Sequence, residues 1–361
     1  MDKINFSAPV NSLSFGNVSI NMLRVLYEKQ VNVSFFPMGQ KLDFSAFDSL
    51  SDDFISWVND CYDNRFKTLD PEAPSLKMWH INGAESRIGR NQYLYTFYEC
   101  DKPTDVEKNI CLMQDHNIFS SSHAKECFKK SGVKNSEYVP IGIDPDIHET
   151  GKTYLKDRIN FGLIGKFEKR KHTAKIIKLW ADRYGNNNDY QLTCCITNPF
   201  FKAEQMAQIL SQSLGNTTFT NINFLPYLKT NSEMNEVYNS IDINLSGLSG
   251  AEGWNLPAFN STCLGKWSIV LNSTSHKDWA NKDNSILVEP KSKEDIYDGA
   301  FFIEGSDFNQ GNLNTFDDES FYLATDKALS KVSEKNKKGV EIKEKFTYDN
   351  CVNQILKIMS K

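Results

Sequence analysis

The sequence predicts an α/β protein with two Rossmann-like domains, each a doubly wound parallel sheet, that face one another across a cleft. Two observations carry this prediction. The chain has 361 residues, enough for two domains of ordinary size. Short apolar strands alternate with helical stretches through most of it, a pattern typical of parallel sheets covered on both faces. A polar stretch at 146–156 separates two such series. We therefore expect domains at 1–155 and 156–325, and a helical segment at 326–361 that packs back across both.

The first domain opens with an expected strand at 3–9, a helix at 18–29 and a second strand at 31–37. Apolar side chains at helical spacing predict the helix. The residues before it are expected to form a tight loop that ends with Gly16 and Asn17. Backbone amides just ahead of a helix can meet a ligand, so these two residues are candidates for a binding loop. An ordinary tight turn is the alternative.

The rest of the first domain continues the alternation, with strands expected at 75–80, 92–98, 116–121 and 137–142 and helices at 54–61, 104–112 and 122–130. Two of these strands end in ionisable residues, His80 and Glu99. In open α/β sheets, ligands bind outside the carboxyl ends of the strands. His80 and Glu99 are therefore candidates for chemistry, and a structural hydrogen-bonding role is the alternative for each.

The second domain repeats the alternation, with strands expected at 160–165, 191–197, 221–225, 242–246, 268–272 and 285–289 and helices near 172–184, 202–214, 231–240 and 257–264. The loop after its first strand, 165–171, has five charged residues among seven, and four of them are basic. Lysines at a strand-to-helix turn suit a diphosphate. A solvated basic loop is the alternative.

The stretch 241–272 contains a strand, a glycine-rich loop, a short helix and a second strand. Pro257 suits the first turn of a helix, where its missing N–H is no loss. Glu252 lies in the loop and Asn260 eight residues later, and both side chains can hydrogen-bond hydroxyl groups. With the amides of the helix start, they indicate a sugar nucleotide as the ligand. A glycine-rich surface turn is the alternative.

Composition narrows the function classes. The net charge of −5 and the pI near 5.8 argue against a nucleic-acid coat or a strongly membrane-attracted surface. The eight cysteines include no Cys-x-x-Cys pair and no histidine cluster has zinc spacing, so we expect reduced cysteines and no metal site. The chain shows no signal-peptide pattern and no apolar run of about 20 residues, which indicates a cytoplasmic protein.

Taken together, these segments resemble the GT-B glycosyltransferases, in particular glycosyltransferase family four, over roughly residues 1–290. The strongest match runs from Ser249 to Asn260. There the family has a Glu, then Gly-aromatic-Gly-Leu-Pro, then a second Glu eight residues after the first. In this chain Asn255 replaces a glycine and Asn260 replaces the second Glu. Weaker matches are the segments 164–166 with Lys171, 224–227 and 139–144, together with Tyr98-Glu99, Ser121-Ser122 and Gly132.

The resemblance implies a metal-independent retaining transferase, without a bound cofactor, that uses a UDP- or GDP-linked sugar as its donor substrate. Lys166 and Lys171 would neutralise the donor diphosphate. Glu252, Gly253, Trp254, Asn255 and Leu256 are the residues expected around the donor sugar. Pro226, Tyr227 and Asn260 are those expected around the nucleotide. Gly16 and Asn17 would lie on the acceptor side, and His80, Glu99 and Glu252 are the candidate catalytic residues.

The sequence leaves three functions open. The first is a transferase with a hydroxyl acceptor, a glycan being the expected class. The second is a viral-type transferase that modifies hydroxymethylated bases in DNA, with the basic stretches 125–134 and 166–175 lining a groove. The third is a non-catalytic sugar-nucleotide-binding protein, which the replaced second Glu keeps open. The donor sugar, its base, the acceptor and the oligomeric state do not follow from the sequence.

Overall fold

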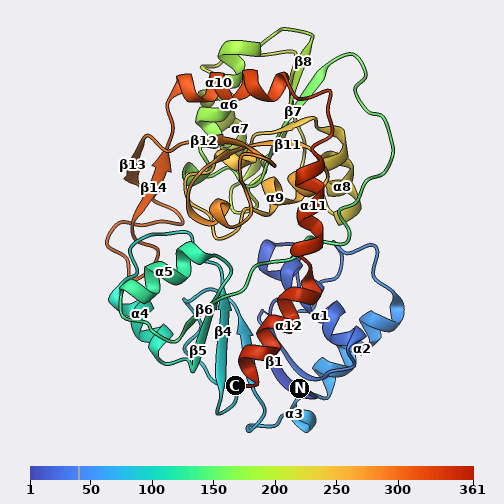
Figure 1. Cartoon of the computed structure of the whole chain (residues 1–361), viewed down its shortest axis with the longest axis vertical. Coiled ribbons are helices and arrows are strands. Elements are labelled where there is room, and N and C mark those ends of the chain that lie inside the picture. The colour runs from blue at the N-terminus through green and yellow to red at the C-terminus, as the bar shows by residue number, and fades with distance from the viewer. Residues whose placement is uncertain (40) are drawn as a thin grey trace.

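A computed structural model of the chain describes residues 1–39 and 41–361, and it consists of two lobes, each built on a parallel sheet of six strands (Figure 1). The predicted α/β fold class is therefore confirmed. The first sheet has the order β2-β1-β3-β4-β5-β6 and the second the order β12-β11-β10-β7-β8-β9. Every strand pair in both sheets is parallel.

In each sheet the chain starts near the middle, builds outward on one side and then crosses back to build the other. The reversal lies between β1 and β3 in the first sheet and between β7 and β10 in the second. Ligands of doubly wound sheets bind at such reversals. The strands of the first sheet are β1 (Lys3–Ala8), β2 (Asn32–Pro37), β3 (Ser75–Met78), β4 (Gln92–Thr96), β5 (His116–Phe119) and β6 (Ser136–Tyr138). Those of the second are β7 (Ile159–Ile164), β8 (Tyr190–Cys195), β9 (Ile222–Phe224), β10 (Ile243–Asn244), β11 (Trp267–Leu271) and β12 (Ile286–Val288).

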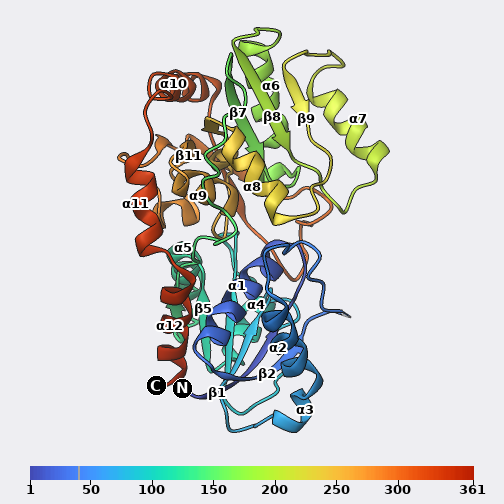
Figure 2. The same cartoon turned by 90° about the vertical axis from the view of Figure 1, so that its right-hand side faces the viewer.

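Helices cover both faces of each sheet (Figure 2). In β4, Leu94 joins the apolar cluster of α4 and α5, whereas the neighbouring Tyr95 points the other way and contacts Cys351 of the last helix. In β7, Leu163 joins the cluster of α6 and α10, and Ile164 joins that of α8. The helices of the first half are α1 (Ser14–Glu28), α2 (Asp52–Asp63), α3 (Arg65–Thr68), α4 (Asp105–Leu112) and α5 (Ser122–Lys130). Those of the second half are α6 (Thr173–Tyr184), α7 (Ala203–Ser213), α8 (Asn231–Ser240), α9 (Leu256–Cys263), α10 (Asp318–Leu329), α11 (Lys337–Lys345) and α12 (Tyr348–Met359).

The first helix begins earlier than expected. Helix α1 starts at Ser14, so Gly16 and Asn17 lie in its first turn, and the prediction of a loop ending at these residues is wrong. Ser-Phe-Gly-Asn has the residue types of a turn. However, Gly16 lies so close to Asn11 that an added Cβ would be 2.2 Å from the Asn11 carbonyl oxygen. The glycine thus permits close packing of helix against loop instead of a turn.

An antiparallel ribbon of β13 (Ser292–Asp295) and β14 (Asn312–Thr315) is, like the short helix α3, an element that the sequence did not predict. It carries the segment 298–309, which lies against the first lobe near α4 (Figure 1). Asp101 of the first lobe accepts hydrogen bonds from the Asn312 N–H at 2.8 Å and from the Lys293 ammonium at 2.7 Å. On the other side, the Asn314 N–H donates to the Gly250 carbonyl of the second lobe at 2.9 Å, so the ribbon is tied to both lobes.

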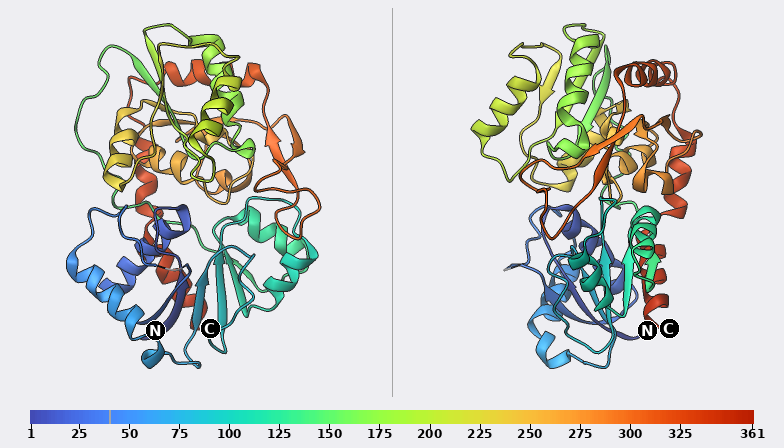
Figure 3. Two further views of the ribbon diagram at one scale, coloured as in Figure 1. Left: turned by 180° about the vertical axis from the view of Figure 1, so that it is seen from behind. Right: turned by 90° about the vertical axis from the view of Figure 1, so that its left-hand side faces the viewer.

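The C-terminal helices run from the second lobe down to the first (Figures 1 and 3). Phe321 of α10 packs in the core of the second sheet, whereas Ile355 of α12 packs in the core of the first. Both chain ends lie side by side at the far end of the first lobe (Figures 1 and 2). None of the helices in the described part of the chain is both long and apolar enough to span a bilayer. All eight cysteines are free thiols.

Candidate active site

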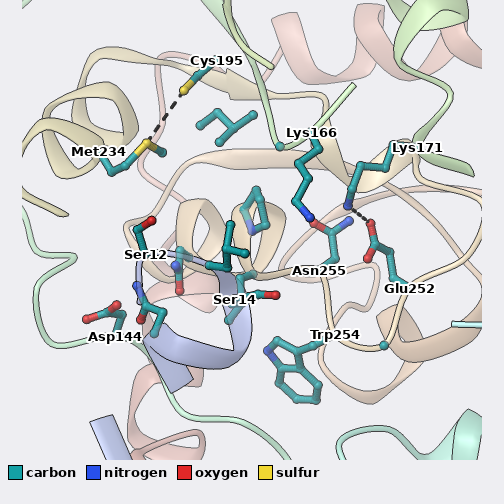
Figure 4. Close-up of a pocket in the computed structure, with 18 of the residues that line it drawn as sticks. Ser12, Ser14, Asp144, Lys166, Lys171, Cys195, Met234, Glu252, Trp254 and Asn255 are labelled. Atoms are coloured by element: carbon teal, nitrogen blue, oxygen red, sulfur yellow. Dashed lines mark hydrogen bonds and ion pairs between the residues drawn. The ribbon is translucent and has the colours of Figure 1, made fainter. Parts of the chain in front are cut away.

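A pocket of about 310 Å³ lies where the reversals of the two sheets meet. Its walls come from the loops after β7 and β10, from the start of α1 and from the loop after β4. Figure 4 shows Lys166, Lys171, Glu252 and Asn255 together at one end, with Asp144, Ser12 and Met234 at the other. The carboxyl ends of parallel strands thus bring residues that are far apart in sequence to one cavity.

The loop after β7 places three cations around this pocket. Gly165 has φ of +129°, a conformation that side-chain-bearing residues rarely adopt, and it turns the chain out of the strand. Lys166 and Lys171 both line the pocket. Between them, Arg170 is 9% exposed and its Nη1 donates to the Ala251 carbonyl at 2.7 Å. The sequence gives no sign that Arg170 turns inward, because a basic run is ordinarily a solvated loop.

Glu252 is the centre of a buried charge cluster. One of its oxygens lies 2.9 Å from Arg170 Nη1, and the other accepts a hydrogen bond from Lys171 Nζ (Figure 4). Arg170 also pairs with Glu168 at 2.8 Å and lies 3.9 Å from Glu99. Each charge in the cluster has an opposite partner, as buried charges require.

The cluster sets the protonation of its members. Burial opposes ionisation of Glu252, but the charges of Arg170 and Lys171 outweigh it and hold its pKa well below the usual range. Burial raises the pKa of Glu99, against the attraction of Arg170. Burial, with repulsion from Arg170 and Lys171, lowers the pKa of Lys166. Glu252 is therefore an anion at neutral pH and available as a hydrogen-bond acceptor.

Asn255 stands where the family that the sequence resembles has a glycine, and its backbone conformation is one that asparagine can adopt. Its backbone is left-handed, with φ of +70°, which asparagine tolerates better than most residues. Its side chain caps α9 by accepting from the Ala258 N–H at 3.3 Å, and its amide donates to His276 Nε2 at 2.9 Å. Since His276 Nδ1 lies 2.8 Å from the Leu271 carbonyl, the imidazole is neutral with its proton on Nδ1. Burial lowers the pKa of His276 to about 4, consistent with this state.

The same loop touches the first lobe. Ser120 Oγ donates to the Gly253 carbonyl at 2.9 Å, and an added Cβ on Gly253 would lie 2.9 Å from Phe97. Trp254 is buried against Phe259 and Phe346. The indole of Trp254 is therefore part of the packing beneath the pocket, and the loop keeps its position by contacts with both lobes.

A second pocket of about 580 Å³ adjoins the first on the side of the first lobe. His80 and Glu99 lie in its wall, with His80 in contact with the Phe15 ring at 4.4 Å between centroids. The His80 side chain is open to this cavity. Desolvation by the surrounding pocket walls, together with the positive charges of Lys166 and Arg170, lowers the pKa of His80 to about 4, so its imidazole is neutral at pH 7. Glu99, Lys166, Glu168 and Arg170 line both pockets. The two cavities therefore share the charge cluster as their common wall.

No protein-family model and no curated protein sequence matches this chain, but many solved structures do. Sucrose-phosphate synthase from Thermosynechococcus elongatus superposes with a TM-score of 0.70 at 13% identity, over all of this chain and 98% of that one. HepE from Anabaena, in complex with UDP and glucose, gives 0.65 at 12% identity over the full length of both chains. The α,α-trehalose 6-phosphate synthase from Burkholderia multivorans gives 0.66 at 10% identity, over 99% and 96% of the two chains. This chain has the GT-B fold.

The GT-B cleft contains most of the predicted residues. Lys166, Lys171 and Glu252, which the sequence assigns to one ligand, converge on the first pocket, as do Asn260, Tyr227, Asn17 and residues 253–256. Two predicted residues do not line either pocket. Gly16 is buried against Asn11, and Pro226 lies beside Tyr227 without reaching the cavity.

Asp144 is a pocket residue that the sequence offered only as part of a weak match. Its carboxyl is 4% exposed and lines the first pocket. Burial and the neighbouring Asp146 raise its pKa to about 6. The buried Asn260 Oδ1, in the wall of the same pocket, has no hydrogen-bond partner among the described residues. The part of the pocket away from Lys166 therefore holds acceptors that a ligand with hydroxyl groups can satisfy.

Proposed function

We propose that this GT-B protein is a retaining glycosyltransferase, resembling family four, that moves a sugar from a nucleotide-diphosphate donor to a hydroxyl acceptor. One observation carries the proposal: Lys166, Lys171 and Glu252 converge on one pocket at the reversal of the second sheet. Cations next to an ionised carboxylate match a ligand that has a diphosphate at one end and hydroxyl groups at the other. HepE has been solved in complex with UDP-glucose as well, which supports a donor of this class here.

Departure of the nucleotide puts negative charge on the diphosphate and positive charge on the anomeric carbon. Lys166 and Lys171 are positioned to stabilise the departing diphosphate. Arg170 holds Glu252, and Glu252 in turn orients Lys171, so the cations are in place before the donor binds. Preorganised charge of this kind usually contributes about 3–4 kcal/mol per contact to lowering the barrier.

The other groups act on the sugar, the nucleotide and the acceptor. Glu252, as an anion, accepts hydrogen bonds from sugar hydroxyls, and Leu256, the first residue of α9, lines the same pocket. Asn260 and Tyr227 contact the nucleotide. The neutral imidazole of His80 adds no positive charge next to the developing oxocarbenium ion. Glu99, with its raised pKa, stands between the two pockets, where it can take a hydrogen bond from the acceptor hydroxyl.

The test is hydrolysis and transfer with a panel of UDP- and GDP-linked sugars. Slow release of nucleotide from one donor, and a product whose anomeric proton coupling matches that of the donor, are expected. Inversion at the anomeric carbon would contradict the proposed retaining mechanism. Binding without turnover of any donor would favour the non-catalytic alternative. Activity in excess EDTA is expected to equal that without it.

The DNA-modifying alternative is not favoured by the structure. It needs the stretch 166–175 as part of an exposed basic groove. Instead Arg170 and Lys171 turn inward to Glu252, and Lys169 and Lys175 donate to backbone carbonyls of residues 295, 297 and 316. Binding to duplex DNA that weakens steeply with salt would restore this alternative.

A further inference from the structure

The second pocket is lined on two sides by aromatic rings from different lobes. From the first lobe, Phe15 stacks on Phe97 with centroids 4.2 Å apart, and Trp79 lies beside them. From the second lobe, Phe200 meets Phe301 edge-on at 5.3 Å. The rings that line this cavity are Phe15, Trp79, Phe97, Tyr98, Phe200, Phe301, Phe302 and Phe308. The wall of this cavity therefore includes aromatic rings from both lobes.

The ring wall of the second lobe is held in a defined position. Asp298 accepts hydrogen bonds from three successive N–H groups, at residues 300–302, and so fixes the turn that carries Phe301. Further along, the Asn309 N–H donates to Glu107 at 2.8 Å and Thr104 donates to the Asp307 carbonyl at 2.6 Å. Both Thr104 and Glu107 belong to the start of α4 in the first lobe. The segment 298–309 therefore spans the cleft and closes the far side of the pocket.

Phe200 is the most solvent-exposed of the described rings in this wall. It is 58% exposed, whereas its neighbour Phe302 is buried. The Lys166 ammonium lies 5.0 Å from the centre of the Phe200 ring. An exposed aromatic ring at a pocket mouth, next to a residue shared with the first pocket, is suited to cover a bound ligand.

The charges around the second pocket disfavour an anionic ligand. The charged residues in its wall are Glu99, Glu107, Glu168, Lys166 and Arg170. Arg170 is committed to Glu168 and Glu252, and Lys166 also faces the first pocket, where the diphosphate is proposed to bind. A phosphate on the ligand would therefore meet three carboxylates, and it would compete with the proposed donor diphosphate for Lys166, the cation of the described wall that has no carboxylate partner.

We infer that the second pocket binds an uncharged saccharide as the acceptor, held between the two ring walls. A pyranose has an apolar face of C–H groups that packs on rings, and a rim of hydroxyls for polar groups. His80, Asn82 and Asn309 supply such groups in the same wall. That the saccharide is the acceptor rests on the proposed function. Binding of the saccharide itself can be measured without turnover.

The experiment is saturation-transfer NMR, with titration of tryptophan fluorescence, on the full chain. The probes are methyl glycosides of glucose, galactose and mannose, the disaccharides maltose and cellobiose, and glucose 6-phosphate. We expect at least one neutral sugar to bind, with glucose 6-phosphate at least tenfold weaker. In Phe200→Ala and Phe301→Ala that affinity should fall at least tenfold. The control Phe66→Ala, at a ring that is 72% exposed in the first lobe and lines neither pocket, should bind normally.

Binding of glucose 6-phosphate above all neutral sugars, no binding of any neutral sugar, or unchanged affinity in both ring variants would each overturn the inference. Trp79→Phe identifies the source of the fluorescence change, since Trp79 is the tryptophan in this wall. Donor hydrolysis, with water as the acceptor, is measured in parallel. Its persistence in Phe200→Ala and Phe301→Ala would locate the defect in the second pocket, whereas its absence in the wild type would count against the proposed function alone.

Discussion

The two pockets of the cleft share a wall but are built from different interactions. The first is organised by a buried charge cluster around Glu252, contributed almost wholly by two loops of the second lobe. The second is organised by aromatic rings, contributed by both lobes and by the segment 298–309. Charge pairs fix directions and distances at short range, whereas ring walls offer area and tolerate different ligands.

This difference suggests how the protein divides its specificity. A diphosphate-sugar needs cations and an anion at set positions, and a cluster in which every charge is paired supplies them before the ligand arrives. Binding in the second pocket, the proposed acceptor site, instead depends on how closely the segment 298–309 is held against the first lobe. Substitutions in the first pocket should therefore change both the stability of the fold and the rate of turnover. Substitutions in the ribbon should mainly change ligand binding.

The largest effect is expected at Arg170. Arg170→Ala leaves Glu168 and Glu252 buried without their main partner, and loss of one member of a buried ion pair costs about 3–5 kcal/mol. Urea denaturation should show a loss of unfolding free energy of that size. The control is Arg183→Ala, which removes a surface pair with Asp326 and should stay within about 1 kcal/mol of the wild type. Equal effects of the two substitutions would show that the cluster does not organise the first pocket.

The next effect is on turnover. Lys171→Ala and Glu252→Ala should each lower kcat for donor hydrolysis at least tenfold without unfolding the protein, because each removes charge next to the diphosphate or the sugar. The lysine–glutamate pair Lys152–Glu236 at the surface provides matched controls. Lys152→Ala and Glu236→Ala should leave kcat unchanged. Near-normal rates in both pocket variants would remove the proposed donor site.

The sequence predicts the first pocket better than the second, for a physical reason. Lys166, Lys171 and Glu252 lie at turns after strands, and in a doubly wound sheet that local position alone determines where they meet. No such rule predicts the position of the segment 298–309. It has neither helical nor strand periodicity, and its place depends on contacts with Thr104 and Glu107, about 200 residues earlier in the chain.

Two errors at or near the first pocket arose because packing contacts, and not the residue types of the local sequence, decide the structure there. Arg170 was missed because a run of basic residues gives no sign of which one turns inward, and only the carboxylates at 168 and 252 decide it. The loop expected at Gly16 and Asn17 was wrong because residue types that favour turns also occur where a helix packs closely on its own preceding loop. Tertiary packing overrides local preference in both cases.

A third prediction compares how two carboxyl groups, one in the first pocket and one at the surface, change the stability of the protein with pH. The pKa of Asp144 is raised to about 6 from an ordinary value near 3.8. Between these values the folded protein holds the proton that the unfolded chain has lost, so this group makes stability fall as pH rises from about 4 to 6. Asp144→Asn removes that loss. Relative to the wild type it should gain up to about 3 kcal/mol between pH 4 and 7, since one pKa unit corresponds to about 1.4 kcal/mol.

The control for this comparison is Asp317, an exposed helix cap. Its pKa is lowered to about 2 by hydrogen bonds from Ser320 and by Lys291. Its contribution to stability is lost only as pH falls below about 4, so the difference between the wild type and Asp317→Asn should be constant from pH 4 to 7. Unfolding free energies at several pH values measure both. A flat difference for Asp144→Asn as well would show that Asp144 is ionised throughout.

The smallest effect is expected at the tie between the ribbon and the first lobe. Asp101→Ala removes the acceptor for Asn312 and the partner of Lys293, both near the protein surface, and should cost no more than about 1–2 kcal/mol. Asp101→Asn keeps an oxygen for the Asn312 N–H and is the matched control. Hydrogen exchange at residues 307–314 should be faster in Asp101→Ala than in Asp101→Asn, with donor hydrolysis unchanged in both. If donor hydrolysis in Asp101→Ala fell as far as in Lys171→Ala, the two pockets would not act independently. The ribbon would then also hold the charge cluster of the first pocket in position.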